Sequence, residues 1–355
     1  MNKIKHITCI VLLLLLALPV SVFASDGGKL NTSQIVVGHI KDSYEWHVTD
    51  IGKQHVIINL PIIVKSSTGW HVFSSSLFSE EADAKGYRHG PYNLAIATTG
   101  DHTGKIVELQ GGQEIVPFDI SITKTVAVLF IDAIILLLCI LIPARWYRHH
   151  KASDPAPGGF TGFVEMLVSF VEENIVKPGV GEGYEKYSPY LMTCFFFILT
   201  CNLMGVVPFP PGGGNVTGNI AVTFFLALCT FIITQLSGTR HYWKDIFWPD
   251  VPKALKIFPL IPLIEFVGIF TKPFALMIRL FANMMAGHAI ALSLTCIIFV
   301  VAAIGGATFY GMTALSVLMS IFMMCLELLV CFIQAMVFTM LSSIFIGLAR
   351  VKSEE

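Results

Sequence analysis

Long hydrophobic runs divide the chain into a mixed amino-terminal third and an apolar remainder. Residues 125–142 contain a single charge, Asp132, and three basic residues follow within the next nine positions. A run of this length and polarity predicts a membrane-spanning helix whose basic end faces the cytoplasm. Further spans are predicted at 189–207 and 218–236. The loop between them lacks Lys and Arg, whereas the loop after them is basic, so the first span starts outside the cytoplasm.

The carboxyl-terminal stretch is the most apolar part of the chain. Between Pro273 and residue 349 the formally charged side chains are Arg279 and Glu327. A Gly305-Gly306 pair divides this stretch into segments of about 31 and 43 residues, or roughly 46 and 64 Å as helices. Both exceed the hydrocarbon core of about 30 Å. Because no turn signal interrupts the last segment, we expect two long, strongly tilted helices.

Two shorter apolar segments do not predict ordinary spans. Residues 162–177 are apolar on one helical face and acidic on the other, which is typical of an interfacial helix on the cytoplasmic side. Residues 1–24 place Lys3 and Lys5 before a short apolar run that ends in small residues. This pattern predicts a signal peptide, with a retained first transmembrane helix as the alternative.

Residues 25–124 differ from the rest, because short β-rich stretches alternate there with Gly and Ser turn signals. We expect a small β-rich extracytoplasmic domain. It holds six of the eleven histidines, but none has tight ligand spacing, so no metal site is predicted. The expected organisation is therefore a signal peptide at 1–24, a β-rich domain at 25–124 and a membrane domain at 125–355.

Composition supports this division and narrows the function. The chain is 54% hydrophobic and 13% charged, with a mean hydropathy of +0.72, whereas an average soluble domain carries about 25% charge. The 23 basic and 24 acidic residues balance, which gives no reason to expect a nucleic-acid partner. The eight cysteines show no C-x-x-C spacing, so no cofactor is expected. We predict an all-α polytopic membrane protein of about five membrane-embedded helices plus the interfacial helix, preceded by the β-rich domain.

Polar and ionisable residues concentrate in the last two predicted helices. Each charge at mid-membrane costs about 2.5 to 3.5 kcal/mol on an insertion scale, so such residues are functional candidates by default. The candidates are Glu265, Lys272, Arg279, Asn283, His288, Glu327 and Gln334.

Helical periodicity orders these residues. Glu265, Lys272 and Arg279 are seven apart and share one face of a continuous helix, which Asn283 extends. His288 is nine positions beyond Arg279 and therefore lies on the opposite face. On the last helix the acidic residue and the glutamine are again seven apart and share a face.

The side-chain types suggest different tasks. Arg279 cannot release a proton and must act as a fixed charge. Its carboxylate partner lies on the last helix or on another protein, because Glu265 is about 21 Å away along the helix. His288 and Glu327 can both exchange protons and together form a candidate relay.

Purely structural roles for these residues stay open at this point. Arg279 and Glu327 could form a structural ion pair, and Lys272 could simply extend to the membrane surface. Asp132, on the first span, suits a structural hydrogen bond as well as a place on the path.

The segment from Lys272 to His288, KPFALMIRLFANMMAGH, closely resembles subunit a of the F-type ATP synthase. That family pattern is Arg-Leu-Phe, a small residue, Asn-Met, then Ala-Gly and a titratable residue. The final helix, with Glu327 and Gln334, is similar to the family's last helix. The resemblance extends roughly over residues 120 to 350.

The resemblance implies a function and a role for each site residue. Arg279 would face the c-ring carboxylate and block a proton short-circuit between two half-channels. His288 and Glu327 would belong to the outer half-channel, and Glu265 to the cytoplasmic one. The lining would include Asn283 and Gln334, with Lys272 and Asp132 as further possibilities.

The resemblance also implies partners and a location. The partners would be the c-ring, the peripheral-stalk subunit b and membrane lipid. The chain would not be an enzyme by itself, and it lacks a nucleotide-binding Gly-x-x-x-x-Gly-Lys loop. It would be a multi-pass protein of the cell inner membrane, with its amino-terminal domain outside and its carboxyl terminus in the cytoplasm.

Two departures from the family pattern stand out. Many bacterial members have Glu where this chain has His288 and His where it has Glu327, an exchange that keeps one group of each kind. The β-rich extension is absent from most members, and contact with the outer rim of the complex is our expectation for it. The coupling ion, H⁺ or Na⁺, depends on the partner's site.

Two other functions are weighed against this one. A secondary transporter would show inverted repeats with paired broken helices, and the sequence has no internal repeat. A receptor-like protein would use the β-rich domain but would leave the intramembrane charges unexplained.

Overall fold

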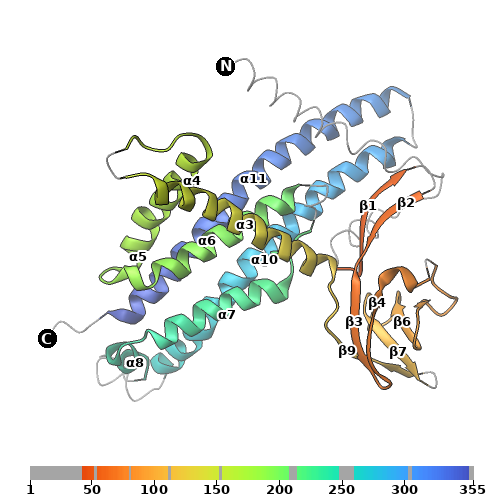
Figure 1. Ribbon diagram of the computed structural model, residues 1–355, viewed down its shortest axis with the longest axis horizontal. Helices are drawn as coiled ribbons and strands as arrows, with labels where there is room; N and C mark the ends of the chain where they lie inside the picture. The colour runs from red at the N-terminus through yellow and green to blue at the C-terminus, as the bar shows by residue number, and fades with distance from the viewer. Residues whose placement is uncertain are drawn as a thin grey trace. The chain divides into compact units, whose positions relative to one another are not determined.

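The computed structural model describes residues 42–51, 54–79, 81–110, 113–151, 154–207, 214–247, 260–302 and 306–351. The predicted signal peptide at 1–24 lies outside the described residues. Strands occur up to Asp119, and helices follow from Lys124 onward (Figure 1). A mostly helical chain with a β-rich amino-terminal part confirms the predicted fold class.

The chain divides into two compact units, which are described separately. One comprises Met1–Ala127 with Leu292–Leu318, and the other Val128–Ala291 with Met319–Glu355.

The β-rich part contains three antiparallel sheets among its described residues. The sheet orders are β1-β2, β4-β3-β9 and β5-β6-β7-β8. The strands are β1 (Glu45–Ile51), β2 (Gln54–Asn59), β3 (Pro61–Ser66), β4 (Gly69–Ser74), β5 (Tyr87–His89), β6 (Leu94–Ala97), β7 (Ile106–Gln110), β8 (Gln113–Ile115) and β9 (Phe118–Asp119).

Alternating side chains build the core of this part. Ile62 and Val64 of β3 are fully buried and pack in one cluster with Leu94 of β6 and Ile106 of β7. Successive strand residues point to opposite faces, so β3 buries its even-numbered positions and turns Pro61 and Lys65 outward.

The helical part begins five residues after β9. A π-helical turn over Glu172–Val176 joins α4 to α5. The helices are α3 (Lys124–His149), α4 (Gly159–Val171), α5 (Lys177–Val180), α6 (Ser188–Val206), α7 (Ile220–Leu236), α8 (Arg240–Phe247), α10 (Leu260–Ala302) and α11 (Gly306–Arg350).

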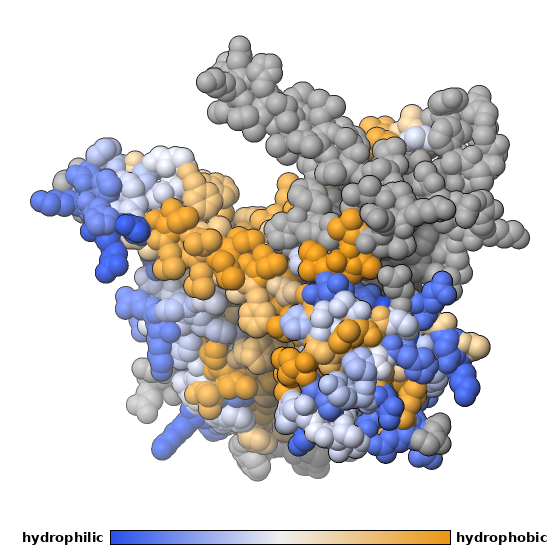
Figure 2. All heavy atoms as spheres, turned by 45° about the vertical axis from the view of Figure 1, so that its right-hand side comes forward, coloured by the Kyte–Doolittle hydropathy of each residue, from blue (hydrophilic) through white to orange (hydrophobic). Residues whose placement is uncertain are grey.

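Several described helices are long and apolar enough to cross a membrane. Three qualify singly, namely α3, α6 and residues Gly311–Arg350 of α11, and the α7–α8 pair, bent by 102°, qualifies as a fourth. They overlap the predicted spans at 125–142, 189–207 and 218–236 and the last predicted helix. The expected total of about five counted α10 as well, which is not among the described helices that qualify. The exposed hydrophobic side chains of these helices form much of the orange surface in Figure 2.

The two carboxyl-terminal helices are long, as predicted. α10 has 43 residues and α11 has 45, or about 65 and 68 Å at 1.5 Å per residue. The first of them is longer than the segment of about 31 residues counted from Pro273, because it begins at Leu260 and continues through the proline. A single proline removes one backbone donor, which transmembrane helices tolerate when neighbouring groups compensate.

α11 approaches α5 so closely that only glycine fits at the contact. A Cβ on Gly347 would lie 2.1 Å from the carbonyl oxygen of Gly179. Nearby, the Ser343 hydroxyl donates a hydrogen bond to the Ile175 carbonyl at 3.2 Å. The backbone of one helix therefore packs directly on the other, and α11 is held by small residues and a hydroxyl.

Substituting Gly347→Ala should destabilise the folded chain, because the new methyl group meets backbone that cannot move aside. Overpacking of this kind costs about 1 to 3 kcal/mol, and thermal unfolding in detergent should report a lower midpoint. Gly311→Ala, on the same helix, is the matched control, since a Cβ at Gly311 would have no other atom within 4 Å. Equal midpoints for the two variants would contradict this packing.

Candidate functional site

Three polar contacts among the described residues join α10 to α11. The His288 Nδ1 atom lies 3.7 Å from Glu327 Oε1, with side chains 16% and 7% exposed. The Asn283 amide donates a hydrogen bond to Gln334 Oε1 at 2.8 Å, and the Ser316 hydroxyl donates one to the Leu294 carbonyl at 2.5 Å. Glu327 and Gln334 are seven residues apart, so both lie on one face of α11. The structure thus brings together four of the residues singled out from the sequence.

The His288–Glu327 contact is close without being a hydrogen bond. Its length exceeds the usual 2.7 to 3.2 Å for a nitrogen donor (about 2.9 Å at the mode). The buried Glu327 Oε1 atom has no hydrogen-bond partner among the described residues. Gly287 permits the approach of the two helices, because a Cβ there would lie 3.1 Å from the same oxygen. An acid and a base therefore face each other, and the Oε1 atom of the acid is free to accept a hydrogen bond.

Arg279 lies outside this contact. Its side chain is exposed, and the described residues form no ion pair with it. The structural ion pair with Glu327 is therefore not present, and Glu327 meets His288 instead. His288 and Asn283 both contact side chains of α11, although the periodicity places Asn283 on the face of Arg279.

The remaining charged candidates are separated from the acid–base pair. Glu265 is exposed on α10. Lys272 is also exposed, and its Nζ atom lies 5.9 Å from the centre of the Phe345 ring. Lys272 lines a small cavity with Gln235 and Tyr242. The cation therefore lies over an aromatic face of α11, away from the acid–base pair.

A buried polar cluster lies next to the acid–base pair, and the sequence reasoning missed it. The Thr217 hydroxyl donates to Asn202 Oδ1 at 2.7 Å, and the Asn202 amide donates to the Cys331 carbonyl at 3.3 Å. Asn215 donates to the Met284 carbonyl at 3.3 Å. Cys331 is one turn from Glu327 and Met284 one turn from His288. The sequence did offer a signal for this cluster, because Asn202 lies within the apolar span predicted at 189–207.

Asp132 of α3 is buried beside this cluster. The residue is 1% exposed, and neither carboxylate oxygen has a hydrogen-bond partner among the described residues. The thiol of Cys201, the neighbour of Asn202, lies alongside the carboxyl group. Both alternatives for Asp132, a structural contact and a place on the path, are compatible with this position.

Metal binding finds no support in the described part of the chain, where no group of three or more His, Cys, Asp or Glu side chains is arranged for it.

Comparison with known families decides the relationship of the helical part. The family described as ATP synthase A chain matches residues 126–347. The chain belongs to this family. A second family, described as Domain of unknown function (DUF8433), matches residues 35–125. The resemblance inferred from the arginine motif is thus confirmed, and the extension is a separate domain.

Individual relatives agree with this membership. ATP synthase subunit a 2 of Chlorobaculum tepidum is 46% identical over 246 residues, covering 68% of this chain and 66% of the relative. ATP synthase subunit a of Chlorobium phaeobacteroides (strain DSM 266) is 45% identical over 242 residues, covering 67% of each. The subunit a of Anaeromyxobacter dehalogenans is 40% identical over 239 residues, covering 66% of this chain and 59% of the relative. The chain thus spans about two thirds or less of these relatives.

Family membership has two direct consequences. The chain is a multi-pass membrane protein, in agreement with its apolar helices. It is a component of an ATP synthase rather than a catalytic subunit.

Replacing Thr217 by Val should destabilise the folded chain, because Asn202 Oδ1 would keep its buried position without a donor. Leaving a buried acceptor unpaired costs about 1 to 3 kcal/mol, measurable as a lower unfolding midpoint in detergent. Thr193→Val is the control, since Thr193 is exposed and its hydroxyl donates only to its own helix at Pro189. A loss as large in the control would contradict a special role for the cluster.

Proposed function

We propose that this chain is the proton-translocating stator subunit of an F-type ATP synthase. It provides two half-channels to the c-ring and couples proton flow to rotation and ATP synthesis. The observation that carries this proposal is the separation of charge types on α10. A fixed cation is exposed on one side, and an acid–base pair is packed against α11 on the other.

Arg279 acts as the fixed charge toward the partner. An exposed cation on an apolar helix is costly in a membrane unless an anion comes to it. The described part of this chain supplies none, so a carboxylate of the c-ring is the fitting counter-charge. Because arginine keeps its proton, it favours release of the proton from that carboxylate and stops protons from passing directly between the half-channels.

His288 and Glu327 carry protons in the outer half-channel. Both can gain and lose a proton, and their side chains are 3.7 Å apart. The Asn283–Gln334 hydrogen bond fixes the helix pair one to two turns away. Asp132 and the cluster around Asn202 extend this polar lining toward α3 and α6.

The cytoplasmic half-channel includes Glu265, which lies on the same stretch of α10 as Arg279 and is exposed. Lys272 lies between them in the sequence and contributes positive charge to that end. The two half-channels thus occupy different lengths of one helix, with the arginine between them.

The orientation follows the loop charges. The amino-terminal domain lies outside, and the carboxyl terminus lies in the cytoplasm, as expected for a multi-pass protein of the inner membrane. The peripheral-stalk subunit b is the second protein partner. The competing function, a secondary transporter, is disfavoured because the chain shows no repeat that would build two related halves.

Arg279→Ala should reduce ATP-driven acidification of inverted membrane vesicles at least tenfold, at matched amounts of assembled complex. The variant loses the charge that holds the c-ring carboxylate ionised, while the helix contacts of α10 remain. Arg240→Ala is the matched control, because Arg240 is also exposed but lies on α8, outside the proposed path. Normal pumping by Arg279→Ala would reject the stator function.

Exchanging the acid and the base tests the relay. His288→Glu alone would set two carboxyl groups against each other and should lower the pumping rate in the same vesicle assay. Adding Glu327→His restores one group of each kind, and the double variant should pump faster than the single variant. If the second change brings no recovery, the two side chains do not work as a pair.

A further inference from the structure

The sheet β4-β3-β9 has an apolar outer face. β3 pairs with β4 so that Lys65 lies opposite Trp70, and with β9 so that it lies opposite Phe118. Beyond β9 the ladder continues, because the Ile120 and Ile122 amides donate to carbonyls of β3 at 2.9 and 3.1 Å. The outer face therefore has three rows: Trp70, Lys65 and Phe118; Val72, Ile63 and Ile120; Ser74, Pro61 and Ile122.

The side chains on this outer face are mostly apolar, whereas a sheet face in contact with water is mostly polar. Antiparallel sheets usually bury one face and present polar side chains on the other. Here Ile62 and Val64 on the inner face are fully buried, yet seven of the nine outer positions are apolar. Val72 is 71%, Phe118 62% and Trp70 55% exposed. Trp70 and Phe118 contact edge to face, with ring centres 6.3 Å apart.

The outer face runs directly into the first transmembrane helix. Ile122 is still in the ladder, and α3 begins two residues later at Lys124. Two residues span at most about 7 Å. The start of α3 is also tied to the domain, since the Lys124 amide donates to the Ser43 carbonyl at 2.8 Å and the Thr125 amide to Asp42 at 3.0 Å. No flexible linker separates the sheet from the helix that enters the membrane.

The composition of the face matches the membrane interface. Tryptophan is enriched at the boundary between hydrocarbon and headgroups, and Lys65 carries the sole formal charge among the nine outer positions. Its Nζ atom lies 5.9 Å from the centre of the Trp70 ring. A cation beside apolar rings suits phosphate headgroups above acyl chains.

We propose that the outer face of the β4-β3-β9 sheet binds the phospholipid surface of the outer leaflet. The strand ladder holds this face within a few residues of the start of α3. Apolar rows enter the interface, and Lys65 meets the headgroups. The amino-terminal domain then binds the membrane interface next to the start of the first span. This assignment depends on α3 crossing the membrane and is independent of the proton path.

The test uses tryptophan fluorescence of the full chain in phosphatidylcholine vesicles with or without bromine on the acyl chains. The emission of the native chain minus that of Trp70→Phe isolates Trp70. Bromolipid should quench this difference at least twofold, whereas iodide in the surrounding solution should quench it little.

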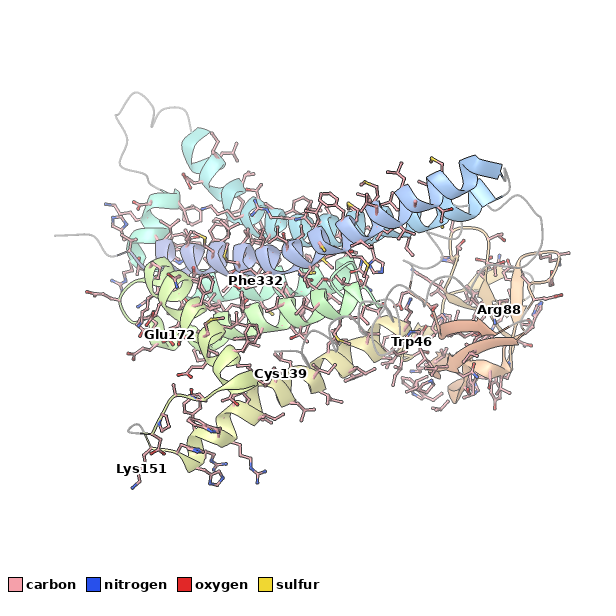
Figure 3. The ribbon with its side chains drawn as sticks, turned by 90° about the horizontal axis from the view of Figure 1, so that it is seen from above. Trp46, Arg88, Cys139, Lys151, Glu172 and Phe332 are labelled. Carbon is pink, nitrogen blue, oxygen red and sulfur yellow. The ribbon has the colours of Figure 1, made fainter. Side chains whose placement is uncertain are left out.

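Trp46 supplies the matched control within the same domain. It lies in β1 (labelled in Figure 3) and is 6% exposed, buried in the protein. The difference between the native chain and Trp46→Phe should be insensitive to bromolipid. The proposal is overturned if iodide, rather than bromolipid, quenches Trp70. It is equally overturned if neither does, because a protein surface then covers the face.

Discussion

Polar groups inside a hydrocarbon layer must find partners within the protein, and the rest of this structure depends on that constraint. The pairing of α10 with α11 is its clearest expression. Two hydrogen bonds, from Asn283 to Gln334 and from Ser316 to the Leu294 carbonyl, and one acid–base contact, between His288 and Glu327, join the two largely apolar helices. The charged side chains of Glu265, Lys272 and Arg279 are instead exposed on α10. The titratable pair thus lies between the two helices, and the fixed charge of Arg279 does not.

The same constraint explains the polar cluster behind the pair. Asn202 is fully buried, yet it both accepts a hydrogen bond, from Thr217, and donates one to the backbone of α11. Asp132 is buried without such support. The thiol of Cys201 lies alongside its carboxyl group. Helix packing by glycine, as at Gly347, holds α11 in place around these groups.

The β-rich domain combines a core typical of a soluble domain with an apolar outer face. Its core is closed by alternating strand residues such as Ile62 and Val64, as in a soluble domain. Its outer face, with Trp70 and Phe118, is not that of a soluble domain. The ladder leads into the start of α3 without a linker, and this continuity is the basis for assigning that face to the membrane interface.

The sequence by itself determined the elements and the candidate residues. The length of a hydrophobic run predicts a membrane helix, and alternation of apolar and polar residues predicts a strand. The spacing of seven between Glu327 and Gln334 places both on one helical face. Each of these signals is a property of residues close together in the sequence. The full length of α10 was underestimated, because its residues were counted from Pro273, and local propensity does not include the compensation that a proline receives inside a membrane helix. Only the tertiary structure decided which groups meet. It paired Glu327 with His288 rather than with Arg279, and it gathered Asn202, Thr217 and Asp132 from separate segments. Contacts between distant segments depend on how helices pack, and no local pattern encodes that.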